Sequence, residues 1–261
     1  MVDMDTPKRD PSIYENISIE DEAQKLVGLC GQMHIDIEDS QAKELIEYLQ
    51  LVLIKNCSLN LTAIREWDKA LVLHLLDSLT LLQEFDAQEE YIQELPFLDM
   101  GCGAGFPGIP LAIMRPLRTG ELCDSVRKKI AAVKGFIHAL HLENQLYTST
   151  ERLEEHANYH KHDFGCVTAR AVASLPVLLE YAAPFLPHDG HLLVSKGQPT
   201  EEELTSGEKA ANLCGFKLAS KRMIDLPNDM GQRVIFDYVK VKEPSLKLPR
   251  AVGLANKEPL A

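Results

Sequence analysis

One stretch decides the fold class of this chain: Phe97-Leu98-Asp99-Met100-Gly101-Cys102-Gly103-Ala104-Gly105-Phe106-Pro107-Gly108-Ile109-Pro110. An apolar run typical of a strand leads into four glycines within eight residues, and a helix is expected to follow. Glycine lets the backbone turn with positive φ and approach a ligand closely. The free N–H groups at the start of a helix favour a polar or anionic ligand. The stretch therefore predicts a strand–loop–helix unit that holds a nucleotide-like cofactor.

Two cofactor fingerprints overlap in this loop. Gly103, Gly105 and Gly108 satisfy the dinucleotide pattern G-x-G-x-x-G, and Asp124 follows the next strand-like run, where a ribose-binding acid is expected. Counted from Asp99, the loop also matches D-x-G-x-G-x-G, which resembles the first motif of class I methyltransferases that bind S-adenosylmethionine. A plain strand-to-helix turn is a third interpretation, but such a turn needs one glycine rather than four.

Length and composition restrict the class of protein. A chain of 261 residues predicts one large domain, or one domain with an extension. No apolar run approaches 18 residues, so no membrane span is expected. Residues 1–10 lack the apolar region of a signal peptide. The six cysteines form no C-x-x-C pair, which favours reduced thiols and a cytoplasmic protein.

The histidines predict no metal site. Nine histidines form no ligand pattern with the cysteines. His156, His160 and His162 lie close together in the sequence, but on a polar stretch that is interpreted as a solvated face.

Charge is unevenly distributed along the chain. Residues 1–96 hold 20 acidic and 7 basic residues, a net charge of −13, whereas residues 97–261 hold 19 acidic and 20 basic residues, a net charge of +1. The negative excess therefore precedes the glycine loop. This asymmetry is compatible with an RNA partner near the C-terminal part, although the total of −12 argues against one.

Four regions follow from the patterning. Residues 1–18 predict a flexible arm, and residues 19–95 a helical extension in which Ser40 caps a helix and residues 71–82 form another. Residues 96–242 predict the cofactor-binding core. Residues 243–261 predict an irregular basic tail on or near that core.

The core pattern alternates strands and helices. Strand-like runs occupy 97–100, 119–123, 145–149, 164–168, 190–195, 216–223 and 234–241. The last two runs lack a helix between them and predict an antiparallel pair. The fold class is therefore α/β: a Rossmann-like class I methyltransferase fold with a seven-stranded, mostly parallel sheet, helices on both faces and an N-terminal helical extension.

Several separate segments then agree on a family. They are Asn60-Leu61-Thr62-Ala63-Ile64-Arg65, His74-Leu75-Leu76-Asp77-Ser78-Leu79, the loop ending Phe106-Pro107-Gly108-Ile109-Pro110, Arg170-Ala171, Ser195-Lys196-Gly197-Gln198 and the closing residues 249–260. In combination the chain resembles the bacterial 16S ribosomal RNA small-subunit methyltransferase G family, also called glucose-inhibited division protein B, from about residue 20 to its end.

The resemblance implies methyl transfer from S-adenosylmethionine to N7 of guanine 527 in 16S rRNA, leaving S-adenosylhomocysteine. Guanine N7 carries a free lone pair, so no general base is expected, and the enzyme's main task is to hold the reacting atoms in line. The implied partner is 16S rRNA, the small ribosomal subunit or its precursor, and a monomer is expected. Alternatives are a small-molecule methyltransferase, a module that only binds the cofactor, and a nicotinamide oxidoreductase.

Candidate site residues come from the motifs and the family resemblance. Predicted cofactor contacts are Asp99, Gly101, Gly103, Phe106, Asp124, Leu153, Glu154 and Arg170. Arg170 and Lys196, each at a predicted strand end, are positioning candidates. For Arg170 the alternative is an ion pair with an acidic residue at the edge of the sheet, and for Lys196 a solvated side chain. Candidate contacts to the RNA are Asn60, Arg65, His74, Asp77, Arg222, Arg233, Lys247 and Arg250.

Overall fold

A seven-stranded sheet forms the centre of the molecule. The computed structural model describes residues 10–170 and 172–261. The strands are β1 (Phe97–Met100), β2 (Gly120–Cys123), β3 (Leu146–Ser149), β4 (Cys166–Arg170), β5 (His191–Lys196), β6 (Phe216–Asp225) and β7 (Gln232–Lys240). Their order is β3-β2-β1-β4-β5-β7-β6, and β7 alone runs antiparallel to its two neighbours. All seven predicted strands and the antiparallel last pair are confirmed.

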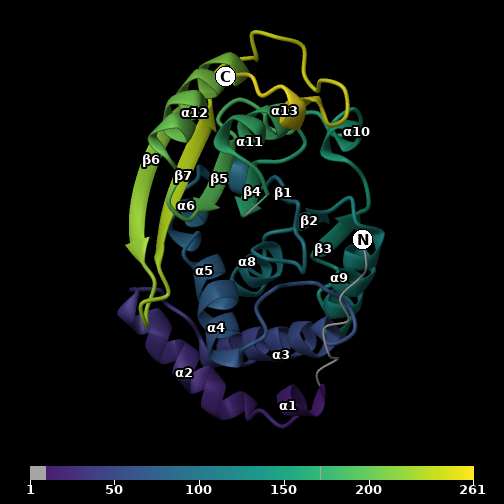
Figure 1. Cartoon of the computed structure of the whole chain (residues 1–261), viewed down its shortest axis with the longest axis vertical. Coiled ribbons are helices and arrows are strands. Elements are labelled where there is room, and N and C mark those ends of the chain that lie inside the picture. Colours follow the sequence, from purple (N-terminus) through teal and green to yellow (C-terminus); the bar gives the residue numbers. More distant parts are fainter. Residues whose placement is uncertain (1–9, 171) are drawn as a thin grey trace.

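Helices cover both faces of the sheet (Figure 1). One apolar cluster joins Leu122 to Ile130 on the face of α8 (Gly108–Met114) and α9 (Arg127–Ala139). A second joins Leu98 to Leu178 on the opposite face. The helices associated with that face are α10 (Leu153–His156), α11 (Leu175–Ala182), α12 (Glu201–Cys214) and α13 (Leu254–Lys257). The buried, apolar β1 is typical of a parallel strand covered on both sides.

The N-terminal region is helical, as predicted. Its elements are α1 (Ser12–Glu15), α2 (Ile19–Gln32), α3 (Asp39–Asn56), α4 (Trp67–Ala70), the π-helix η1 (Leu71–Leu76), α5 (Asp77–Leu79), α6 (Leu82–Asp86) and α7 (Glu90–Gln93). Here α3 packs against α8 and α9. In Figure 1, α1 to α4 lie below the sheet.

Two details of this region differ from the sequence expectations. Glu38, not Ser40, occupies the N-cap of α3, and its backbone N–H donates to Oε1 of Gln41 at 3.1 Å. The helix expected over 71–82 is interrupted, because it begins as η1 and continues as α5 and α6. A π-helical turn has i→i+5 bonds and often marks a functional position.

Both ends of the chain pack on the rest of the molecule where the structure describes them. Tyr14 is buried, and its hydroxyl donates to the carbonyl oxygen of Arg65 at 2.6 Å, so residues 10–18 pack on the helices. The flexible arm was predicted over residues 1–18, and residues 1–9 of it lie outside the described residues. In the C-terminal tail, Leu248 and Leu260 pack against the second apolar cluster. Among the described helices, none combines the length and apolar character needed to cross a membrane.

Candidate functional site

The glycine loop is anchored by Asp99. The backbone N–H of Gly108 donates to Oδ2 of Asp99 at 2.8 Å, which ties the end of β1 to the start of α8. A Cβ at position 108 would lie 2.7 Å from that oxygen, so only glycine fits. Burial raises the pKa of Asp99 to about 7, although the N–H of Gly108 opposes the shift. Asp99 therefore fixes the conformation of the glycine loop through its hydrogen bond to Gly108.

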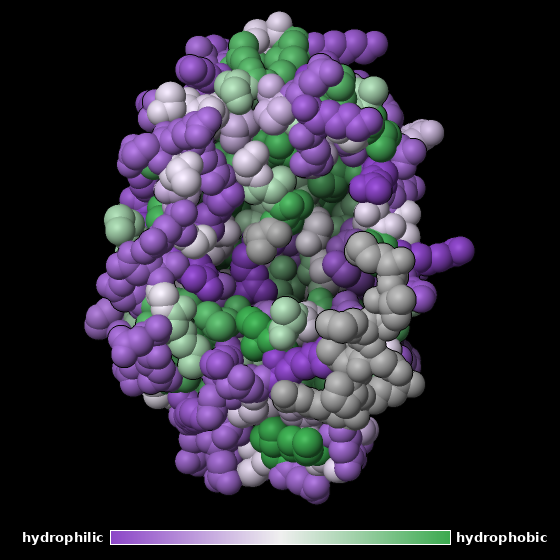
Figure 2. Space-filling model, viewed as in Figure 1, coloured by the Kyte–Doolittle hydropathy of each residue, from purple (hydrophilic) through white to green (hydrophobic). Residues whose placement is uncertain are grey.

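A first cleft opens beside this loop, at the carboxyl ends of β1 and β2. Its volume is about 340 Å³. Gly101, with φ +73°, forms part of its floor. Four residues of the predicted cofactor set line it: Gly101, Asp124, Leu153 and Glu154. Figure 2 shows that the face of the molecule seen in Figure 1 is hollowed near its centre, with apolar residues inside the hollow.

Asp124 holds the wall of the first cleft. Its Oδ2 accepts the N–H of Gly103 at 3.1 Å, and its Oδ1 accepts the N–H of Val126 at 2.8 Å. Gly103 is thus placed by Asp124, and it is not among the residues that line the cleft. A carboxylate has about four acceptor positions, so Asp124 retains capacity for a further ligand.

The C-terminal tail closes the first cleft. Glu154 accepts the backbone N–H of Gly253 at 2.7 Å. Nδ2 of Asn256 donates to the hydroxyl of Tyr181, also at 2.7 Å. Tyr181 and Asn256 both line the cleft, and the sequence analysis missed them as site residues. Asn256 lies in the closing segment, residues 249–260, that supported the family resemblance. That resemblance was the signal from which Asn256 could have been predicted as a site residue.

A second cleft lies beside the first, between η1 and the carboxyl ends of β4 and β5. Its volume is about 390 Å³, and Ala173 lines both clefts. It brings together five of the predicted residues, which are His74, Asp77, Arg170, Lys196 and Arg233.

Arg170 inserts beneath the π-helical turn. Its Nη1 donates to the carbonyl oxygens of Leu73 at 3.3 Å and His74 at 3.2 Å, and lies 3.4 Å from Oδ2 of Asp77. Arg170, predicted as a cofactor contact, lines the second cleft and not the first. Arg170 does form an ion pair, but with Asp77 of helix α5 rather than with an acidic residue at the edge of the sheet. Arg233 also pairs with Asp77, at 3.0 Å.

Phe106 is buried behind the second cleft. The His74 ring stacks on it with centroids 4.7 Å apart and planes 13° apart, and the Arg170 guanidinium lies 5.2 Å from the ring centre. Phe106, predicted as a cofactor contact, lines neither cleft. The ring connects the glycine loop to His74 and Arg170 through these two contacts.

His74 is held neutral. Burial, helped by the charge of Arg170, lowers the pKa of His74 to about 3. Its Nε2 lies 2.8 Å from the hydroxyl of Thr62, whereas its buried Nδ1 has no hydrogen-bond partner among the described residues. A buried polar atom without a partner at a cleft is available to a ligand.

Lys196 is held at the end of β5. Its Nζ donates to the carbonyl oxygen of Ala173 at 2.9 Å and also pairs with Glu203. The alternative of a fully solvated lysine is therefore wrong.

Other predicted RNA contacts lie away from the clefts. Arg222 pairs with buried Glu84, and Arg250 with buried Glu180, which neutralises both charges within the fold and argues against phosphate contact. Exposed Lys247 borders a separate hollow near the amino end of β5. Nη2 of Arg65 donates to Oδ1 of Asn60 at 3.1 Å; neighbouring Ile64 lines the second cleft.

The solvated face expected for the clustered histidines is wrong for His156, which is only 2% exposed. Its side chain faces Glu121 of β2 rather than solvent.

The sheet order, the glycine loop and the paired clefts define a class I S-adenosylmethionine-dependent methyltransferase. The family model described as rRNA small subunit methyltransferase G matches residues 41–229. Proteins named ribosomal RNA small subunit methyltransferase G are similar: that of Pelotomaculum thermopropionicum is 36% identical, covering 88% of this chain and 95% of its own, and that of Alkaliphilus metalliredigens is 34% identical with the same coverage. The chain belongs to the rRNA small subunit methyltransferase G family.

Solved structures agree on the fold. The [4+2]-cyclase SpnF aligns with a TM-score of 0.53 at 10% identity, over 76% of this chain and 97% of its own. Geranyl diphosphate C-methyltransferase from Streptomyces coelicolor A3(2) aligns with a TM-score of 0.50 at 11% identity, over 64% and 79%.

Proposed function

We propose that this enzyme transfers a methyl group from S-adenosylmethionine to N7 of guanine 527 in 16S rRNA. The observation that carries the proposal is the pair of clefts that meet at Ala173 on the carboxyl edge of the sheet. Open α/β sheets bind their ligands at this edge. The methyl donor would occupy the first cleft and the target base the second, with the methyl group passing where they meet.

The walls of the first cleft suit the donor. Asp124 would bind the ribose hydroxyls with its remaining acceptor positions. Leu153, beside the buried Glu154, offers an apolar contact for the adenine ring. Gly101 would pass the methionine part, because its lack of a side chain allows close approach of the backbone.

The second cleft suits a base that needs no deprotonation. Guanine N7 attacks the sulfonium methyl group with its own lone pair, and positive charge moves from sulfur to the base. His74 is neutral, and the carboxylate of Asp77 is engaged by Arg170 and Arg233. Neither side chain needs to remove a proton from guanine, so the cleft would serve to orient the base. Holding N7, carbon and sulfur in line contributes several kcal/mol to catalysis.

The same cleft carries the charges that an RNA loop requires. Arg170, Lys196 and Arg233 surround it, and the Asn60–Arg65 segment borders it through Ile64. Because Arg170 and Arg233 share the single carboxylate of Asp77, one positive charge remains at the cleft, and we expect it to steer phosphates there. The substrate would be 16S rRNA within the small subunit or its precursor, and the enzyme would act as a monomer in the cytoplasm.

The test uses 16S rRNA, free and in small subunits, from cells that lack this protein. Incubation with the enzyme and labelled S-adenosylmethionine should place one methyl group on N7 of guanine 527, and rRNA with adenine at that position should gain none. Label at another nucleotide would overturn the assigned position. Label that enters metabolites but no rRNA would instead identify a small-molecule methyltransferase.

A further inference from the structure

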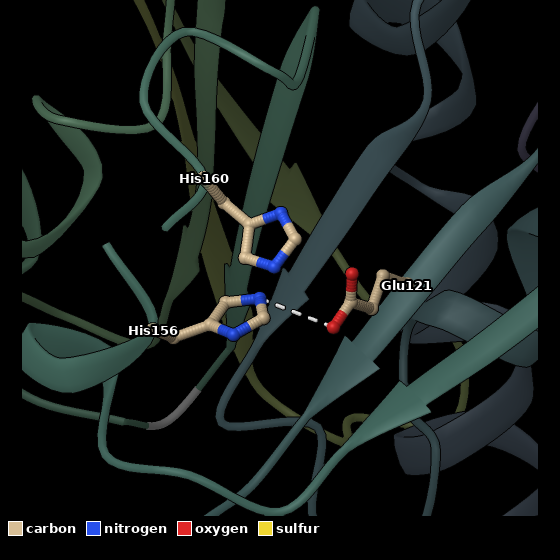
Figure 3. Close-up of side chains that lie close together, drawn as sticks. All are labelled: Glu121, His156 and His160. Atoms are coloured by element: carbon tan, nitrogen blue, oxygen red, sulfur yellow. Dashed lines mark ion pairs between the residues drawn. The ribbon is translucent and has the colours of Figure 1, made fainter. Parts of the chain in front are cut away.

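Three side chains converge behind the first cleft. Glu121 lies on β2, His156 ends α10, and His160 follows one helical turn later, since its N–H donates to the carbonyl oxygen of His156 at 3.2 Å. One potential ligand atom from each residue lies within 4.8 Å of the others. Figure 3 shows a ring nitrogen of each histidine facing the Glu121 carboxylate. None of the three lines either cleft, so this cluster is separate from the methyl-transfer site.

Each histidine is oriented by a second carboxylate. Nδ1 of His156 lies 2.9 Å from Oε2 of Glu151, and Nδ1 of His160 lies 3.1 Å from Oδ2 of Asp163. A carboxylate at one ring nitrogen fixes the proton there and leaves the lone pair on the other, which is the usual arrangement around a metal-bound histidine. Both Nε2 atoms are thereby prepared to act as ligands.

The contact between His156 and Glu121 is not a well-formed hydrogen bond. Nε2 of His156 lies 3.1 Å from Oε1 of Glu121, yet this buried nitrogen has no partner with hydrogen-bond geometry among the described residues. Two ligands of a tetrahedral zinc ion, each about 2.1 Å from the metal, lie roughly 3.4 Å apart. The observed separation is close to that value.

We propose that Glu121, His156 and His160 form a Zn²⁺ site. The donor set of two imidazoles and one carboxylate suits zinc, whereas magnesium and calcium prefer oxygen ligands alone. A water molecule would complete the tetrahedron. The side chain of His160 is 38% exposed, which gives a metal ion access to the site.

The site would connect two elements that build the first cleft. Glu121 lies on β2, three residues before Asp124 of the first cleft. His156 lies on α10, two residues after Glu154 of the same cleft. A metal ion would therefore hold the strand and the helix together from behind. Because a ligand that binds only the folded state stabilises it by mass action, zinc should raise the melting temperature.

The experiment uses the full-length protein freed of metal with a chelator. Titration with Zn²⁺ should show one tight site per chain and a higher melting temperature, and Co²⁺ should give the visible absorption of a tetrahedral complex. His160→Gln should abolish the absorption and the stabilisation. Glu151→Gln should weaken binding by about 10- to 100-fold while leaving the ligands in place.

The matched control is His138→Gln. His138 is an exposed histidine whose Nδ1 also lies beside a carboxylate, that of Glu143, but among the described residues no third potential ligand joins them. This variant should bind zinc like the unaltered protein. If His160→Gln proves unfolded by circular dichroism, Glu121→Gln replaces it. The proposal is overturned if the unaltered protein takes up no zinc, or if the ligand variants and His138→Gln bind it equally well.

Discussion

Nη1 of Arg170 donates a hydrogen bond to the carbonyl oxygen of His74, 3.2 Å away and 96 positions earlier in the chain. The π-helical turn η1 supplies this carbonyl, and Arg170 lies at the end of β4. The contact joins the helical extension to the catalytic edge of the sheet. The extension is therefore one wall of the second cleft.

Arg170→Ala should destabilise the protein without weakening its cofactor binding. The variant removes hydrogen bonds to two buried carbonyl oxygens and one of the two cations that pair with Asp77. Because Arg233 still pairs with Asp77, the expected loss is about 2 kcal/mol rather than the larger loss for a buried charge left alone. Urea unfolding measures the stability, and calorimetry with S-adenosylhomocysteine measures the dissociation constant.

Arg127→Ala, on the exposed first turn of α9, is the control and should change neither quantity. An Arg170→Ala protein with unaltered stability and much weaker binding of S-adenosylhomocysteine would contradict this prediction. It would place the guanidinium on the cofactor, as the sequence first indicated.

Strands β1, β4 and β5 were predictable because each is a short, largely apolar run bounded by turn residues, whereas β6 is ten residues long and mostly polar. Asp124 was predicted to follow the second strand, and it does lie directly after β2. Charge pairing was not predictable. Arg222 reaches Glu84 across 138 positions, and a single sequence carries no signal for which distant acid will pair with a given arginine.

Burial was misjudged where a polar stretch folds onto the sheet. His156 lies among charged and polar neighbours in the sequence, yet α10, which it ends, places it against Phe185 and beside Glu121 of β2. Local composition describes neighbours along the chain, whereas burial depends on elements that arrive from elsewhere.

Asp124→Asn should raise the dissociation constant of S-adenosylhomocysteine roughly tenfold. Such a change corresponds to the loss of about 1.5 kcal/mol for one hydrogen bond to a charged group. Ser125→Ala is the matched control, because Ser125 is exposed and lines the same cleft. Equal affinities for Asp124→Asn and the unaltered enzyme would mean that the ribose is held elsewhere.

Glu154→Ala should loosen the C-terminal tail and weaken cofactor binding together. The carboxylate accepts the N–H of Gly253 at 2.7 Å, and the tail brings Asn256 to the first cleft. Hydrogen exchange at Gly253 should become faster, and the dissociation constant of S-adenosylhomocysteine should rise about tenfold. Glu155→Ala, on the exposed neighbour, serves as control. Faster exchange with unchanged affinity would show that the tail plays no part in binding.

His74→Gln should alter how the free energy of unfolding depends on pH. The folded state holds the pKa of His74 near 3, while the unfolded chain has the ordinary value of 6.5, so between these pH values the unfolded chain binds the extra proton. The stability due to neutral His74 is complete above pH 6.5 and is lost as the pH falls toward 3, by at most about 1.4 kcal/mol per pH unit. Glutamine does not titrate, so the difference in unfolding free energy between the two proteins should shrink steadily over this range. A difference that stays constant from pH 7 to pH 4 would show that His74 is protonated equally in both states.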